Sequence, residues 1–259
     1  KTAYEIRPRD WSSDVCSSDL AETDPRLTFA VNAACDLDSA IERLADLPPQ
    51  RHQWSAAELA VHRKRLNANL RPASDRFTPW QALDLLRAKL PADGMLAYDV
   101  GAHTHQIASQ WPAHAPGTFL ITNGWSSMGF GLPAAIAAKL ARPDRPVLCI
   151  LGDGCFQMTC GEVAVAKRMG LALPIVVLDD KWLGLIKVKQ IRRQFPLYGT
   201  ELQEEDYTEP PAHYFGVPAV GVRSAEALEN AVKKALSAKG PTVIEAVVDS
   251  EHYVDTVYD

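Results

Sequence analysis

From Phe77 onward, short apolar segments alternate with segments whose pattern is helical. The apolar segments are rich in β-branched residues and read GMLAYDV, PVLCIL, LPIVVL and PTVIEAVV. Strands that are apolar on both faces and alternate with helices are typical of a parallel sheet with helices on both sides. The sequence therefore predicts an α/β fold over residues 77–259, built on a doubly wound, mostly parallel sheet.

Composition narrows the class of protein. The 259 residues carry a net charge of −5, and Lys and Arg are spread along the chain, so we expect no nucleic-acid partner. No apolar run approaches the ~18 residues of a membrane span, so we expect a soluble protein without a membrane partner. The five cysteines form no CxxC pair and no zinc-type pairing with His. These cysteines fit a reducing cytoplasm best.

The first 76 residues differ from the rest. Residues 1–20 have no apolar period, and the triplet Ser-Ser-Asp occurs in them twice. The stretch DVCSSDL can be back-translated into a DNA sequence that resembles a common sequencing adaptor. We therefore interpret residues 1–20 as a non-native or disordered leader. Residues 21–76 contain one strand pattern (RLTFAVNAACD) and two helical patterns (LDSAIERLADL and SAAELAVHRKRLNANL). This is too little to form a core, so we expect the tail of a preceding middle domain plus a linker. The chain would then be the C-terminal piece of a longer protein.

Polar clusters follow three of the predicted strands. They are residues 99–103 (DVGAH), residues 152–154 (GDG) and Asp179-Asp180, and parallel strands bring all three to one edge of the sheet. The glycines beside Asp153 allow a sharp turn and the approach of a ligand. The helix start that follows suits a phosphate, but a carboxylate there would repel phosphate unless a cation lay between them. The pattern therefore predicts Mg²⁺ bridging carboxylates and phosphate oxygens.

The order and spacing of these clusters resemble a known family. Gly152-Asp153-Gly154, a spacer of 24 residues and Asp179-Asp180 are similar to the diphosphate-binding motif of thiamine diphosphate enzymes. The stretches NGWSSMGFGLPAAIAAKLARPDRPVLCILGDGCFQMTCGE and YDVGAHTHQIASQW further resemble the acetolactate synthase branch. The resemblance covers residues 77–259, and residues 27–70 weakly. It implies that residues 77–259 are a C-terminal thiamine diphosphate-binding domain.

The resemblance also implies site residues. Asp153 and Asp180 would bind Mg²⁺ through their carboxylates, and Trp182 through its backbone carbonyl. Met128 would hold the cofactor bent under its thiazolium ring, and Ser126 with Met128 would pair with the aminopyrimidine. The remaining predicted cofactor contacts lie at the diphosphate or close over the cofactor: Gly101, Ala102, His103, Gly152, Gly154, Cys155, Leu183, Gly184 and Leu185.

In that family, the cofactor supplies a carbanion that attacks a 2-oxo acid substrate. The implied function is a thiamine diphosphate- and Mg²⁺-dependent decarboxylase or carboligase, assembled as a homodimer or homotetramer, and FAD binding is left open. The activating Glu of the family lies in a pyrimidine-binding domain of a second subunit. We find no such domain here, so we assign no catalytic residue and expect the chain alone to be inactive.

The sequence departs from the family pattern at two positions, and two alternative functions remain open. Asp179 stands where the family often has Asn, and Lys189 stands where acetolactate synthases tend to have Trp, so the substrate stays open. The chain could instead be a separate diphosphate-domain subunit of a split decarboxylase. It could also be a non-catalytic phosphate- or nucleotide-binding module, although it contains neither GxGxxG nor GxxxxGK[ST].

Overall fold

The computed structural model describes residues 35–48, 54–122, 124–202 and 210–257. The chain divides into two compact units, Lys1–Leu59 and Ala60–Asp259. The two helices predicted in the first part of the chain are present as α1 (Leu37–Ala45) and α2 (Ala56–Leu70). The leader at residues 1–20 and most of the predicted strand before α1 lie outside the described residues. The predicted domain boundaries stay predictions.

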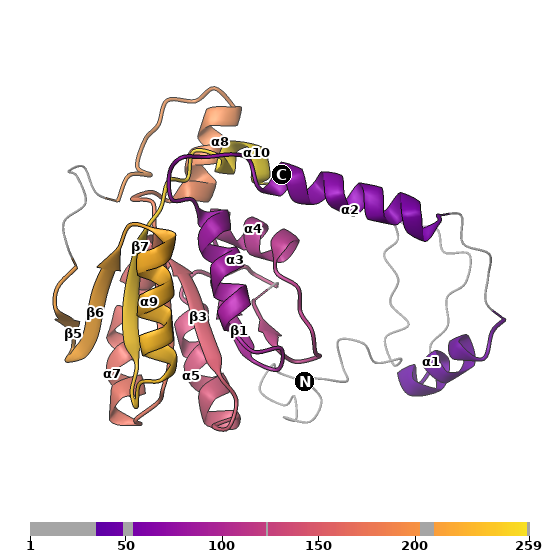
Figure 1. The fold of residues 1–259 in the computed structure, drawn as a ribbon, viewed down its shortest axis with the longest axis horizontal. Coiled ribbons are helices and arrows are strands. Elements are labelled where there is room, and N and C mark those ends of the chain that lie inside the picture. Colours follow the sequence, from indigo (N-terminus) through magenta and orange to yellow (C-terminus); the bar gives the residue numbers. More distant parts are fainter. Residues whose placement is uncertain (1–34, 49–53, 123, 203–209, 258–259) are drawn as a thin grey trace, which may run out of the picture. The chain divides into compact units, whose positions relative to one another are not determined.

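The second unit contains a sheet of seven strands in the order β2-β1-β3-β4-β7-β6-β5 (Figure 1). Every neighbouring pair is parallel except β5 and β6, which are antiparallel. The predicted fold class is therefore confirmed. The strands are β1 (Met95–Tyr98), β2 (Phe119–Leu120), β3 (Val147–Gly152), β4 (Pro174–Asp179), β5 (His213–Tyr214), β6 (Val217–Val222) and β7 (Thr242–Val247).

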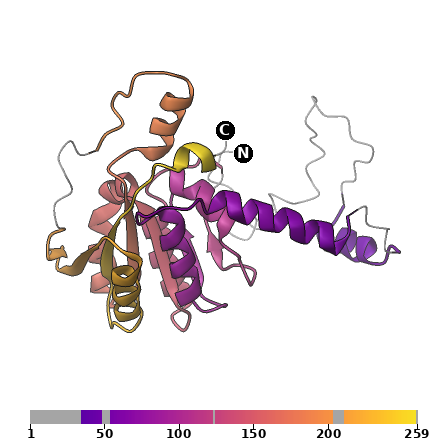
Figure 2. The same ribbon diagram turned by 45° about the horizontal axis from the view of Figure 1, so that its top comes forward.

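Helices lie on both faces of the sheet (Figures 1 and 2), and the core consists of two hydrophobic layers, one on each face. Successive strand side chains point to opposite faces, so Leu96 and Tyr98 join one layer while Met95 and Ala97 join the other. The first layer is covered by α3 (Pro79–Lys89), α4 (Ala102–Gln110) and α9 (Ala225–Leu236), and the second by α5 (Gly131–Ala141), α6 (Asp153–Thr159) and α7 (Val163–Arg168). Two further helices, α8 (Gly184–Arg192) and α10 (Tyr253–Thr256), share a third, smaller cluster.

Helix ends follow local chemistry. Thr78 caps α3 in a capping box with Gln81, and Pro79 occupies the first turn, as the sequence predicts. The stretch EALENAVKKALSAKG predicts a helix closed by Gly240. This prediction is wrong, because α9 ends at Leu236. The Ser237 hydroxyl there donates to the carbonyl oxygens of Lys233 and Lys234 and satisfies them before the glycine is reached.

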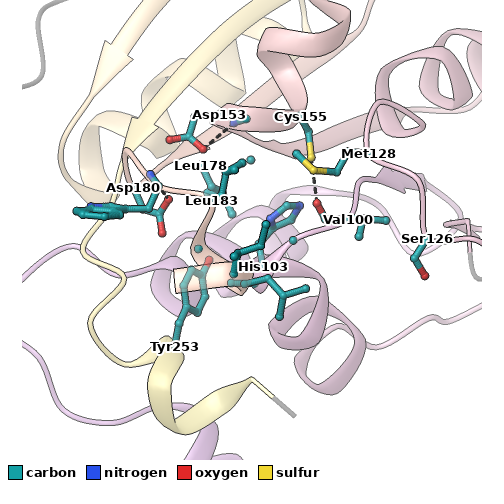
Figure 3. Close-up of a pocket in the computed structure, with 18 residues that line it drawn as sticks. Val100, His103, Ser126, Met128, Asp153, Cys155, Leu178, Asp180, Leu183 and Tyr253 are labelled. Atoms are coloured by element: carbon teal, nitrogen blue, oxygen red, sulfur yellow. Dashed lines mark hydrogen bonds between the residues drawn. The ribbon is translucent and has the colours of Figure 1, made fainter. Parts of the chain in front are cut away.

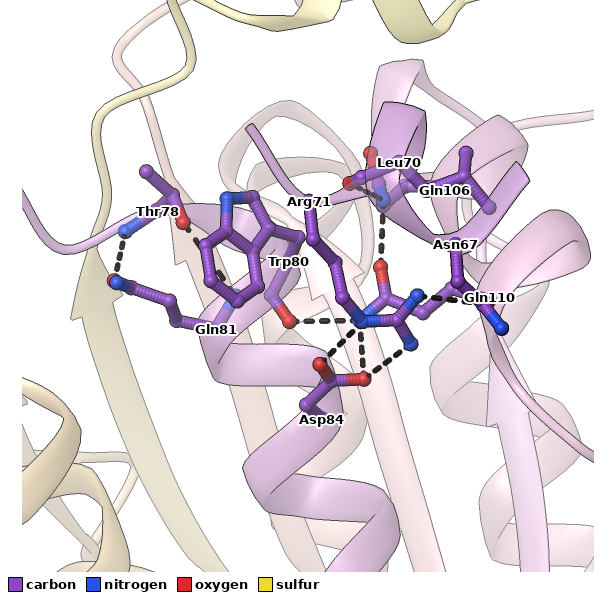
Figure 4. Close-up of polar contacts among 9 residues, drawn as sticks. All are labelled: Asn67, Leu70, Arg71, Thr78, Trp80, Gln81, Asp84, Gln106 and Gln110. Atoms are coloured by element: carbon purple, nitrogen blue, oxygen red, sulfur yellow. Dashed lines mark hydrogen bonds and ion pairs between the residues drawn. The ribbon is translucent and has the colours of Figure 1, made fainter. Parts of the chain in front are cut away.

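A partly buried polar network joins the end of α2 to α3 and α4 (Figure 4). The Arg71 guanidinium donates two hydrogen bonds to the Asp84 carboxylate, at 2.7 and 2.8 Å. Gln110 Nε2 donates to Asp84 Oδ1 and to the carbonyl of Trp80, both at 2.7 Å. Gln106 Nε2 donates to the carbonyl of Leu70 at 3.1 Å. These bonds fix α4, and hence its first turn, against α2 and α3.

No helix within the described ranges is long and apolar enough to cross a membrane.

Candidate functional site

A cavity of about 200 Å³ opens at the carboxyl ends of β1, β3 and β4 (Figure 3). In the sheet, β2 lies on one side of β1 and β3 lies on the other, so the strand order reverses direction at β1. Ligands of parallel sheets bind at such reversals of strand order. Every residue predicted to contact the metal or the cofactor lines this cavity, although the contacts themselves stay predictions. They are Gly101, Ala102, His103, Ser126, Met128, Gly152, Asp153, Gly154, Cys155, Asp180, Trp182, Leu183, Gly184 and Leu185.

Two half-buried carboxylates form one wall. Asp153 is the first residue of α6, and its oxygens accept from the backbone N–H groups of Gly154 (2.7 Å) and Lys181 (2.8 Å). Asp180 Oδ1 accepts from the N–H of Trp182 at 3.1 Å, whereas Oδ2 is buried without a partner among the described residues. Burial and the neighbouring Asp180 raise the pKa of Asp153, and burial raises the pKa of Asp180. The pair therefore favours a bound proton or a bound cation.

The turn between β4 and α8 holds Trp182 beside these carboxylates. Lys181 adopts a left-handed φ of 67°, a conformation that costs a non-glycine residue about 1–2 kcal/mol. Its N–H also donates to Asp179 Oδ1 at 3.1 Å, and its carbonyl accepts from the N–H of Leu202 at 2.9 Å. The N–H of Leu183 donates to the carbonyl of Thr200 at 2.7 Å. These bonds offset the strain of the turn.

His103 contributes an unpaired nitrogen from the opposite wall. The sequence placed His103 in a loop, and this is wrong: it lies in the first turn of α4, 5% exposed. Its ring points into the cavity (Figure 3), and Nε2 has no partner among the described residues. Burial lowers the pKa of His103 to about 4, so the imidazole is neutral at pH 7 and carries a single N–H. The unpaired nitrogen donates to an anion in the tautomer that holds this proton on Nε2.

The glycines of the GDG motif provide room for close packing. Gly152 has an extended backbone (φ −83°), so the sharp turn expected there needs no glycine conformation. A Cβ on Gly154 would lie 2.9 Å from Leu183 Cδ2, and one on Gly152 would lie 3.1 Å from His103 Cε1. A Cβ at either position would therefore press on a side chain that lines the cavity.

Asp99 organises the loop that carries Met128. The sequence located Asp99 at a strand end without giving it a role. Its fully buried carboxylate accepts from the backbone N–H groups of Gly129 (3.0 Å) and Gly131 (2.9 Å). Cys155 is fixed nearby, since its thiol donates to the carbonyl of Val100 at 3.0 Å and burial raises its pKa to about 12. The thiol therefore stays protonated.

Four lining residues were not identified from the sequence: Val100, Leu178, Ile186 and Tyr253. The first three lie beside predicted residues, so the motif could have been extended to include them. Tyr253 comes from the far C-terminal end of the chain, and no motif in the sequence signals its return to the cavity.

The donor set fits a diphosphate with a divalent cation. Asp180 Oδ2 and His103 Nε2 are buried and have no hydrogen-bond partner among the described residues. The carboxylate oxygen is suited to a cation, and the imidazole nitrogen is suited to an anion when it carries a proton. Within the described residues, no group of three or more His, Cys, Asp or Glu side chains could hold a metal ion. A cation here would need further oxygen ligands from the backbone and from the ligand itself.

Comparisons with known proteins agree with this geometry. A family model described as "Thiamine pyrophosphate enzyme, C-terminal TPP binding domain" matches residues 99–246. The large subunit of acetolactate synthase isozyme 2 from Escherichia coli is 36% identical over 173 residues, which are 64% of this chain and 31% of that protein. The acetolactate synthase large subunit of Lactococcus lactis is 27% identical over 243 residues, 91% of this chain and 41% of that protein.

A solved structure is also similar. The thiamine diphosphate-dependent 4-hydroxybenzoylformate decarboxylase of Rhodococcus jostii matches with a TM-score of 0.62 and 25% identity, over 80% of this chain and 36% of that one. The chain thus spans less than half the length of these relatives. The resemblance inferred from the GDG motif is confirmed: this chain belongs to the thiamine pyrophosphate enzymes and carries their C-terminal TPP binding domain.

Proposed function

We propose that this chain binds Mg²⁺ and the diphosphate of thiamine diphosphate in the cavity of Figure 3, as part of a decarboxylase or carboligase acting on 2-oxo acids. The observation that carries this proposal is the convergence of a half-buried carboxylate pair and an unpaired imidazole nitrogen on one cavity. When bound, thiamine diphosphate supplies the carbon nucleophile and the electron sink that protein side chains lack. The named relatives, acetolactate synthases and a decarboxylase, support this substrate class.

In this proposal, Asp153 and Asp180 hold Mg²⁺ with their carboxylates, and Trp182 adds its backbone carbonyl. The raised pKa of each acid supports the assignment, because a divalent cation would offset the cost of two buried negative charges. The neutral His103 donates to the diphosphate from Nε2, in the tautomer that holds its proton there. The backbone around Gly101, and the GDG motif with Cys155, line the same space without bulky side chains.

The other predicted cofactor residues surround the organic part of the cofactor. Met128 supports the thiazolium ring, and Asp99 positions it by fixing the N–H groups of Gly129 and Gly131. Ser126 is exposed and lines the cavity, and the neighbouring Trp125 is 94% exposed. This open side is where we place the pyrimidine domain of a second subunit, which contributes the activating Glu. The second subunit would belong to a homodimer or homotetramer.

We also propose a cytoplasmic location. Cys149, Cys155 and Cys160 form no disulfide within the described part of the chain, and this supports a reducing compartment.

Isothermal titration calorimetry on the 259-residue chain tests the proposed ligand. Thiamine diphosphate with Mg²⁺ should bind, and ADP with Mg²⁺ should bind at least tenfold more weakly, because ADP has the diphosphate but not the thiazolium that Met128 supports. Tight binding of ADP without binding of thiamine diphosphate would overturn the proposal in favour of a nucleotide-binding module.

A second assay tests the proposed source of the activating Glu. The purified chain, supplied with thiamine diphosphate, Mg²⁺ and pyruvate, should release no CO₂ above the protein-free background. Turnover by this chain alone would show that the activating carboxylate is its own.

A further inference from the structure

Tyr253 lies in the wall between the cofactor cavity and a second cavity of about 490 Å³. It is the first residue of α10 and is 4% exposed. The wall that separates the two cavities also contains Asp180, Trp182 and Gly184. Tyr253 therefore stands beside the proposed metal ligands, although it comes from the far end of the chain.

The tyrosine ring is held firmly. It packs in the small cluster with Ala102, Val188 and Val257, which joins the start of α4 and the middle of α8 to α10. The Arg192 guanidinium donates to the carbonyls of Val254 and Val257, both at 2.6 Å, and so anchors α10 to the end of α8. Because both ends of α10 are fixed, the direction of the ring is set by the fold.

The hydroxyl is directed at the ligand space. Figure 3 shows the Tyr253 ring pointing into the cavity, and no hydrogen bond joins its hydroxyl to the other residues drawn there. Asp153 and Asp180 both act electrostatically on this phenol, so it lies near the carboxylate pair. Asp180 Oδ2 is unpaired as well, so the two groups do not satisfy each other.

We propose that the Tyr253 hydroxyl donates a hydrogen bond to a phosphate oxygen of the bound diphosphate. This inference rests on the proposed function. A tyrosine phenol is protonated at pH 7, so it can donate to an acceptor. With Mg²⁺ bound by Asp153 and Asp180, the free acceptors nearest the hydroxyl are the phosphate oxygens that the same cation attracts.

The test compares the wild-type chain with Tyr253→Phe, which removes the hydroxyl and keeps the ring. Calorimetry with Mg²⁺ should show binding of both pyrophosphate and thiamine diphosphate weakened by about tenfold, since a hydrogen bond to a charged group is lost. Tyr198→Phe is the matched control because Tyr198 is 86% exposed, and it should bind both probes like the wild type. The melting temperature of Tyr253→Phe checks that the ring still packs.

A third probe distinguishes a contact of Tyr253 with phosphate from an effect of Tyr253 on metal binding by Asp180. Mn²⁺ alone, followed by electron paramagnetic resonance, should bind the wild type and Tyr253→Phe within twofold of each other. Equal pyrophosphate affinities in the two proteins would overturn the proposal, and so would an equal loss of affinity for Mn²⁺ alone. As an independent readout, pyrophosphate should perturb the tyrosine near-ultraviolet spectrum of the wild type, and this change should be missing in Tyr253→Phe.

The wild type separates this inference from the proposed function. If it binds pyrophosphate but not thiamine diphosphate, the proposed function fails, while the pyrophosphate comparison still decides the role of Tyr253. If it binds neither probe, both proposals fail.

Discussion

The substitution Asp153→Asn should change how the stability of the metal-free chain depends on pH. Burial and Asp180 raise the pKa of Asp153 in the folded chain, whereas in the unfolded chain it should be ordinary, at about 4. The folded chain therefore holds a proton that the unfolded chain has lost. The stability contributed by this group is complete below about pH 4 and is lost as pH rises toward the folded pKa.

The size of the effect follows from one proton. Each pH unit in which the folded chain binds one extra proton lowers the free energy of unfolding by about 1.4 kcal/mol. Between pH 5 and pH 7, the wild type should therefore lose about 2.7 kcal/mol through this group. Asparagine has no proton to hold, so Asp153→Asn should lack this loss.

Urea unfolding in the presence of EDTA at pH 5, 6 and 7 measures the difference between the two proteins. His103, whose pKa is lowered to about 4, contributes stability with the opposite sign as its unfolded form loses a proton, but both proteins contain it. Asp144→Asn, at an exposed position after α5, is the control and should follow the wild type. A constant free-energy difference between the wild type and Asp153→Asn from pH 5 to pH 7 would refute the reasoning.

Two further predictions concern residues that position the elements around the cavity. In Gly131→Ala, the new Cβ would lie 2.6 Å from Leu151 Cδ2 and 3.1 Å from the backbone nitrogen of Asp99, so overpacking should lower the free energy of urea unfolding by about 1–3 kcal/mol. Gly161→Ala meets no atom within 4 Å and should leave stability nearly unchanged; equal effects of the two substitutions would contradict this. Asp84→Ala should cost about 1–2 kcal/mol by removing the carboxylate that accepts hydrogen bonds from both Arg71 and Gln110, whereas Arg76→Ala, at an exposed ion pair, should leave the urea midpoint unchanged. A midpoint for Asp84→Ala equal to that of Arg76→Ala would mean that the network of Figure 4 adds nothing.

The parallel sheet and the convergence of its strand ends could be predicted because both depend on local patterns. Apolar β-branched runs specify buried strands, and parallel strands bring Asp153 and Asp180 to one edge. The helix α4 was missed because Gln106 and Gln110 occupy its buried face. Their partners are the backbone of Leu70 and Trp80, so the helix has no apolar period to detect.

Other features depend on partners far along the chain. The Asp99 carboxylate bonds a loop some thirty residues later, and Tyr253 reaches the cavity only because α10 packs back on α4 and α8. Neither relation leaves a spacing or periodicity that one sequence can reveal. The GDG motif therefore predicted the carboxylate wall of the site better than its surroundings.

The central claim is that Asp153 and Asp180 hold a cation that binds the diphosphate. Calorimetric titration of thiamine diphosphate into the wild type and Asp180→Ala, each with Mg²⁺ and with EDTA, tests it most directly. We expect the wild type with Mg²⁺ to bind thiamine diphosphate at least tenfold more tightly than the protein in each of the other three titrations. Each of those three lacks the cation or one of its carboxylate ligands. Equal affinity for thiamine diphosphate with and without Mg²⁺, or in the wild type and Asp180→Ala, would contradict the claim.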